Sequence, residues 1–210
     1  MPNIIAIGAI LASMLTATPA AAPATTVASG PPDGVSIDII VANGSGCPAG
    51  TTSISIAPGN DAFTVTYRTF HAQAGAGAGA VDFRKNCQLN LQIRIPEGWT
   101  YAVAQIDHRG RAHLEPGATG IQRSSFYFAG VPATGAVTHQ FAGPYDDAWA
   151  VTNVVEQAAL IYGPCGGERN LNINNEVRVS AGTSDPATNS SITMDSTTSG
   201  IYHFRWRQCS

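Results

Sequence analysis

The densest group of side chains that could do chemistry lies between residues 107 and 113. Asp107, His108 and His113 could share a zinc or copper ion, because these metals bind imidazole nitrogens and carboxylate oxygens. Their spacing, however, matches neither H-x-H nor H-E-x-x-H. The alternative is a polar hairpin with its turn at Gly110 and its charged side chains in water. Both interpretations stay open at this point.

Acidic residues offer two further kinds of chemistry. Asp146 and Asp147 follow Gly143-Pro144-Tyr145, which is typical of a turn, and they could also serve a calcium-binding loop. A glycoside hydrolase needs two carboxylates across a cleft, but no spacing selects such a pair here. The nucleophile motif G-x-S-x-G is also missing. We therefore favour a protein without catalysis and without a cofactor, with calcium or a transition metal as the alternative. The acidic pool consists of Glu97, Asp107, Glu115, Asp146, Asp147, Glu156 and Glu176.

Aromatic side chains give the best indication of a binding surface. Flat rings exposed on a β-sheet stack against sugar rings and anchor protein interfaces. The alternative is that most of these rings pack in the core, where aromatic residues bury large areas. The aromatic residues in excess of what alternation places inside are Trp99, Tyr101, Tyr127, Tyr145, Trp149 and Tyr162. Of these, the candidate ligand-binding residues are Trp99, Tyr101, Tyr145 and Trp149.

Residues 1–24 are predicted to be a secretory signal peptide. They contain no charged side chain, an apolar run over residues 4–15, and A-x-A cleavage sites after Ala22 and Ala24. The apolar run is shorter than the roughly 20 residues that cross a bilayer. We therefore expect a secreted, extracellular protein with no membrane attachment after the signal is removed.

The four cysteines all follow this segment, and an even number of cysteines in an exported chain predicts disulfides. Four cysteines allow three connectivities. We favour Cys47 with Cys87 and Cys165 with Cys209, which close loops of similar size. Sequons at Asn43 and Asn189 agree with export and predict N-glycosylation.

The charge balance excludes some classes of partner. Charged residues make up 12% of the chain, the formal net charge is -3, and Lys85 is the single lysine among 11 basic residues. Nucleic acids and anionic membranes require clustered basic charge, which is missing here. The expected partner is therefore a glycan or another protein.

Short β-branched and aromatic runs separated by Gly, Pro and Asn predict about ten strands. The clearest covers residues 88–95, where apolar and polar side chains alternate, and we expect it to form a hairpin with residues 99–106. The alternating Ala and Gly of residues 74–80 predict a turn or flexible connection. The other expected strands are 35–42, 53–57, 62–70, 111–114, 122–129, 137–142, 148–155, 158–162, 170–180, 191–194 and 202–207.

This pattern favours an all-β fold, an antiparallel β-sandwich of jelly-roll or related type held by disulfides. We expect a single domain over residues 35–210, preceded by a flexible linker over residues 25–34.

Several segments together resemble DUF4360, a family of exported proteins known as a domain of unknown function. The resemblance covers residues 41–209 and is most specific around the cysteines and in the C-terminal strand. It implies a secreted, disulfide-containing β domain and assigns no catalytic residue. The segments are 43–50 (NGSGCPAG), 84–91 (RKNCQLNL), 96–99 (PEGW), 107–114 (DHRGRAHL) and 202–209 (YHFRWRQC).

These observations predict a secreted, non-catalytic β-sandwich that binds a glycan or protein ligand at the cell surface or outside the cell. The alternatives are a secreted hydrolase with a dispersed acidic pair and a secreted structural or inhibitory protein.

Overall fold

The computed structural model describes residues 31–165 and 169–209 of the 210-residue chain. The predicted signal peptide and residues 25–30 of the predicted linker lie outside the described residues. Within the described ranges, no helix has the length and apolar character that crossing a membrane requires.

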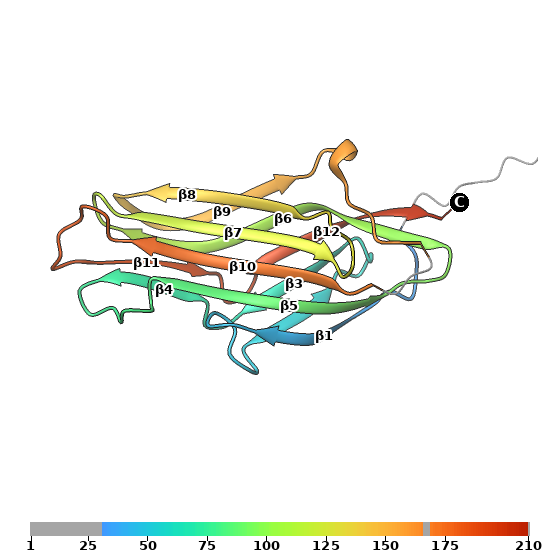
Figure 1. Ribbon diagram of the computed structural model, residues 1–210, viewed down its shortest axis with the longest axis horizontal. Helices are drawn as coiled ribbons and strands as arrows, with labels where there is room; N and C mark the ends of the chain where they lie inside the picture. Colours follow the sequence, from blue (N-terminus) through green and yellow to red (C-terminus); the bar gives the residue numbers. More distant parts are fainter. Residues whose placement is uncertain (1–30, 166–168, 210) are drawn as a thin grey trace, which may run out of the picture.

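Two antiparallel β-sheets pack against each other, which confirms the predicted all-β sandwich (Figure 1). Sheet A has the strand order β1 (Ser36–Asn43), β5 (Arg84–Arg94), β10 (Leu171–Ser180), β7 (Thr119–Phe128) and β8 (Gly135–Ala142). Sheet B has the order β2 (Thr52–Ile56), β3 (Ala62–Tyr67), β12 (Gly200–Gln208), β6 (Trp99–Leu114), β11 (Asn189–Met194) and β4 (His71–Gly75). Strand β9 (Tyr145–Val154) also pairs with β6.

The core forms where the inner faces of the two sheets meet. In β5, Leu89, Leu91 and Ile93 are at most 5% exposed, and the polar residues between them point outward, as the alternation predicts. In β12, Tyr202 and Phe204 enter the core, where Tyr202 stacks on Phe63 of β3 with ring centroids 4.9 Å apart and Phe204 packs at a tilt against the same ring at 5.3 Å. The alternation of apolar and polar residues in each strand therefore determines which side chains pack between the two sheets.

Strand β6 corrects the expected hairpin at Gly110. It is one continuous strand of 16 residues, and Gly110 lies inside it. A Cβ atom at Gly110 would collide with the carbonyl oxygen of Thr193 and with the ring of Trp149. Glycine is therefore needed for the close approach of two neighbouring strands, and it makes no turn.

The expected hairpin between residues 88–95 and 99–106 is also wrong. Strand β5 belongs to sheet A and β6 to sheet B, so the turn at Pro96 connects the two sheets. The expected strand over residues 158–162 is replaced by a 3-10 helix, Gln157–Ala159, and an isolated bridge between Ala102 and Tyr162. Strand β4 was not expected, because its sequence HAQAG has little β propensity.

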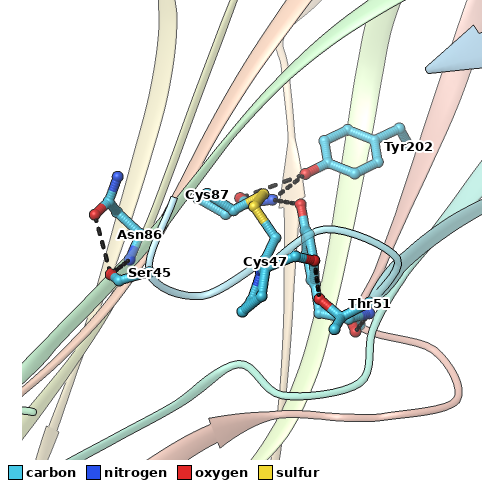
Figure 2. The surroundings of a disulfide bond; sticks show 10 residues. Ser45, Cys47, Thr51, Asn86, Cys87 and Tyr202 are labelled. Carbon is cyan, nitrogen blue, oxygen red and sulfur yellow. Dashed lines mark hydrogen bonds between the residues drawn. A yellow bond between two sulfur atoms is a disulfide. The ribbon is translucent and has the colours of Figure 1, made fainter. Parts of the chain in front are cut away.

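The disulfides join Cys47 to Cys87 and Cys165 to Cys209, the pairing that the sequence favours. Cys87 lies in β5 and Cys47 in the connection between β1 and β2, and both are 1% exposed (Figure 2). Beside this bond, the backbone amide of Asn86 donates to Ser45 Oγ at 3.2 Å. The first disulfide is thus part of the core, whereas Cys165 is exposed.

The two disulfides close loops of nearly equal length, with sequence separations of 40 and 44 residues, so removing either should cost about 4 kcal/mol of loop entropy. We expect the double variant Cys47→Ala/Cys87→Ala to lose about 2 kcal/mol more than Cys165→Ala/Cys209→Ala, because only the first removes buried sulfur atoms. Urea unfolding of both variants measures the difference. Equal losses would contradict the buried placement of the first bond.

A polar layer crosses the core between the sheets. Asn175 of β10 donates from Nδ2 to the hydroxyls of Tyr67 and Tyr202, at 2.8 and 3.0 Å. The Tyr202 hydroxyl lies 3.4 Å from Nε2 of His108, which is 0% exposed. Burial raises the pKa of Tyr202 to about 12. Burial, with the neighbouring His139 adding to it, lowers the pKa of His108 to about 4.

This layer predicts a loss of stability in mild acid. Unfolded His108 binds a proton below its ordinary pKa of 6.5, whereas the folded side chain stays neutral until about pH 4. The unfolded state binds more protons in this window, so stability is complete above pH 6.5 and falls by about 3 kcal/mol as the pH drops to 4. The charged and titratable groups that influence His108 are His139 and Asp107.

Urea unfolding of the wild type and of His108→Gln at several pH values between 7 and 4 tests this expectation. The stability difference between the two proteins should shrink as the pH falls, because the variant lacks the titrating group. A difference that stays constant over this range would rule out the neutral, buried His108.

Candidate functional site

The three residues of the expected transition-metal site do not converge. Alternate residues of β6 point to opposite faces, so His108 enters the core while Asp107 and His113 lie on the outer face of sheet B. His113 lies six positions after Asp107 along the strand, a span of about 20 Å. Among the described residues, no three His, Cys, Asp or Glu side chains could hold a metal ion together.

Asp107 instead connects three strands of sheet B. It accepts hydrogen bonds from Thr152 Oγ1 at 2.6 Å and Gln105 Nε2 at 3.0 Å, and lies 2.7 Å from His203 Nε2. Burial raises the pKa of Asp107, but these hydrogen bonds together outweigh it and hold the pKa below its ordinary value. The carboxylate therefore stays ionised and links β6, β9 and β12.

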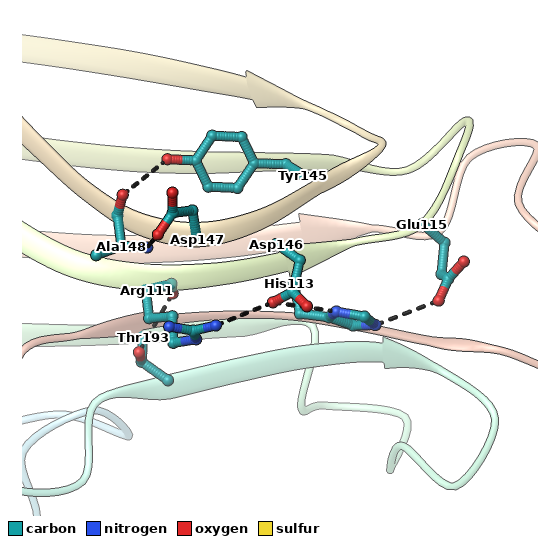
Figure 3. A network of polar contacts seen from close by, with 8 residues as sticks. All are labelled: Arg111, His113, Glu115, Tyr145, Asp146, Asp147, Ala148 and Thr193. Carbon is teal, nitrogen blue, oxygen red and sulfur yellow. Dashed lines mark hydrogen bonds and ion pairs between the residues drawn. The ribbon is translucent and has the colours of Figure 1, made fainter.

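Asp146 and Asp147 lie in β9, so the turn is made by the cis Gly143-Pro144 bond that precedes this strand. Asp146 contacts the side chains of Arg111 and His113 at 3.3 and 3.5 Å (Figure 3). Asp147 accepts from the backbone amide of Ala148 at 2.7 Å. Neighbouring residues of a strand point to opposite faces, and this arrangement gives the two carboxylates separate surroundings.

The four candidate aromatic residues do not form one surface. Tyr101 and Trp149 are each 4% exposed and pack in the core, against Phe128 at 5.2 Å and Phe141 at 5.3 Å between ring centroids. Tyr145 is partly buried, and its hydroxyl donates to the carbonyl of Ala148 at 3.0 Å. These rings contribute mainly to packing, which corrects the expectation of an exposed aromatic row.

Trp99 and Tyr101 do line one pocket together, at the end of the sandwich where β5 passes to β6. This end pocket has a volume of about 290 Å³. Its walls combine apolar side chains such as Ile95 with the charged residues Glu97 and Arg169. Of the four aromatic candidates, Trp99 and Tyr101 are thus the pair that the fold brings together.

The outer face of sheet A carries a set of side chains that the sequence did not reveal as a candidate site. Strand pairing places Asn90 beside Asn172, and Gln88 beside Asn174, across β5 and β10. We call this surface the amide face; its amides are Asn86, Gln88, Asn90 and Gln92 of β5 and Asn172 and Asn174 of β10. Strand β7 continues the same rows, with Tyr127 beside Asn172 and Ser125 beside Asn174.

Hydrogen bonds within the amide face orient several of its side chains. Asn90 Nδ2 donates to Asn172 Oδ1 at 2.9 Å, and Asn170 Nδ2 donates to Asn90 Oδ1 at 2.6 Å. Farther along the same strands, Glu176 accepts from Arg84 Nε at 2.6 Å and from Arg178 Nη2 at 3.0 Å. The face therefore presents fixed donors and acceptors.

A groove of about 240 Å³ lies on this surface. Its side chains offer amide, hydroxyl, guanidinium and carboxylate groups, which suits a ligand with many hydroxyl groups more than an apolar one. The residues of the groove are Arg84, Asn86, Cys87, Gln88, Arg123, Ser125, Asn174, Asn175 and Glu176.

The fold and this face define an all-β protein with two disulfides and a polar outer sheet surface. The family model described as a domain of unknown function, DUF4360, matches residues 33–209, and the chain belongs to this family. An uncharacterized secreted protein of Arthroderma benhamiae is 35% identical over 181 residues, which cover 85% of this chain and 73% of that protein. No solved structure matches the chain.

Proposed function

We propose that this chain is a secreted, non-catalytic protein that binds a glycan outside the cell through the amide face. The observation that carries the proposal is the set of six amides on the outer face of two neighbouring strands, with Tyr127 beside them; five of the amides are at least partly exposed and Asn172 is 6% exposed. Each amide offers a carbonyl acceptor and an NH₂ donor. Each sugar hydroxyl both donates and accepts a hydrogen bond, so the carbonyl and the NH₂ of one amide can together satisfy both roles.

Two features of the face favour binding. The bonds among Asn90, Asn170 and Asn172 hold these side chains in place, so less side-chain entropy is lost when a ligand binds. Tyr127 is partly exposed and supplies a ring on which a sugar can stack. Polar contacts and one aromatic ring thus lie within a single face.

The acidic content of the groove supports binding without hydrolysis. Glycoside hydrolysis requires two carboxyl groups about 5 to 10 Å apart. Among the described residues of the groove, Glu176 is the only carboxylate, and it is held by Arg84 and Arg178. A paired carboxylate of this kind serves structure or ligand orientation.

Export of the chain is part of the same proposal. The relative from Arthroderma benhamiae is named as a secreted protein. Both disulfides agree with export, since disulfides persist mainly outside the cytosol. The predicted signal peptide supplies the route.

A glycan array probed with the mature protein tests the binding function. We expect binding to at least one class of polysaccharide, and a roughly tenfold or larger loss of affinity in Asn174→Ala and in Tyr127→Ala, because each removes about 1.4 kcal/mol or more of contact. Ser53→Ala, at an exposed position of β2 in sheet B, is the matched control and should bind normally. A blank array, or binding that survives both substitutions, would contradict the proposal.

We also propose that Asn43 carries an N-linked glycan. Asn43 is exposed at the end of β1, whereas Asn189 Nδ2 donates to the carbonyl of Ala76 at 3.0 Å, a bond that a glycan would break. In a glycosylating host, Asn43→Gln should remove the endoglycosidase-sensitive mass and Asn189→Gln should leave it. Mass spectrometry of the secreted protein decides, and a glycan found only on Asn189 would refute this assignment.

A further inference from the structure

The polar layer of the core contains buried atoms that no side chain satisfies. Eight such atoms have no hydrogen-bond partner among the described residues, and seven of them lie on strands β6, β7 and β9. Buried polar groups in folded proteins are nearly always hydrogen-bonded, to protein or to ordered water. The seven atoms are Tyr101 Oη, His108 Nδ1, Gln122 Nε2, Gln122 Oε1, Ser124 Oγ, Trp149 Nε1 and Asn153 Nδ2. Tyr101 lies apart from the others, in the end pocket, which leaves six atoms.

Strand pairing brings these residues into one region. Gln122 points inward from β7, is 0% exposed, and stands beside His139 of β8 in the pairing register. His139 Nε2 lies 2.9 Å from Asn153 Oδ1 of β9, so this part of sheet A meets β9 across the core. On sheet B, His108 pairs with Val151, between the inward Trp149 and Asn153.

None of these six atoms forms a direct hydrogen bond with another. The indole of Trp149, the amide nitrogen of Asn153 and the amide nitrogen of Gln122 can only donate. Gln122 Oε1 is an acceptor, and Nδ1 of neutral His108 and the hydroxyl of Ser124 take either role. A water molecule accepts and donates two hydrogen bonds, so it satisfies donors and acceptors that do not reach each other directly.

We propose that about two ordered water molecules lie between the sheets at Gln122 and bridge it to His108, Trp149 and Asn153. The number follows from six unsatisfied atoms and the roughly three hydrogen bonds that a buried water makes. These waters extend the direct network of Asn175, Tyr67 and Tyr202 toward β9.

The edge between β8 and β9 gives these waters a route to solvent. These strands are not paired with each other, because β8 belongs to sheet A and β9 to sheet B. His139 and Asn153 are partly buried at this edge. The bound waters therefore exchange with the bulk slowly, through fluctuations of this edge.

Water-selective NMR on ¹⁵N-labelled mature protein tests the proposal. We expect the Trp149 indole and the Gln122 amide to show cross-peaks to water with the sign that a long-lived bound molecule produces. Trp206 is the internal control, because its indole donates to the carbonyl of Asn60 at 2.8 Å and should lack such a peak. If Trp149 and Gln122 show no cross-peak to long-lived water in the wild type, the proposal is overturned.

The variant Gln122→Met tests whether the water detected at Trp149 is held by Gln122. Methionine keeps the length of the side chain and removes the amide nitrogen and oxygen, so the waters lose their hydrogen bonds to residue 122. We expect the water cross-peak of Trp149 to weaken at least severalfold while the dispersed backbone spectrum is kept. An unchanged peak would overturn the role of Gln122, and the wild-type measurement stands by itself if the variant fails to fold. The glycan array does not depend on this outcome.

Discussion

Hydrogen bonds along both edges of β6 hold sheet B together, and they fix which side chains of β6 and its neighbours face the core. Residues 105–108 of β6 pair with β12 on one edge and with β9 on the other, and residues 110–113 pair with β11 and β9 in the same way. The strand must remain continuous through Gly110, because no larger residue fits between Thr193 and Trp149. This continuity sends His108 inward and Asp107 outward, which separates two residues that are adjacent in sequence.

The two disulfides lie at different places in the β-sandwich. Cys47–Cys87 fastens the connection after β1 to β5 of sheet A, inside the core. Cys165–Cys209 ties the segment after β9 to the end of β12, beside the end pocket formed by Trp99 and Tyr101. The strands that precede these two cysteines, β9 and β12, both pair with β6, so the second bond links the chain segments that follow the two neighbours of β6.

The sequence was sufficient for features that depend on local pattern and insufficient for those that depend on strand order. Alternation in residues 88–95 correctly separates core from surface, because side chains in a strand alternate between faces. The false hairpin at Pro96 arose because a turn signal does not say whether the chain stays in its sheet or crosses to the other. The amide face was missed for the same reason: β5 and β10 are about 80 residues apart in sequence, as Asn90 and Asn172 show, and only the fold makes them neighbours.

The composition of β10 bears on what the amide face does. Asparagine is disfavoured in strands, yet the sequence LNINNEVRVS places three asparagines within five residues of this central strand. Asn175 has a structural reason, since it bonds Tyr67 and Tyr202 inside the core. Asn174 points outward into the groove, where threonine or valine would suit the strand better and no buried partner requires an amide. Stability therefore gives no reason for asparagine at position 174. The glycan-binding proposal gives one, because an amide on the outer face can bind a ligand there.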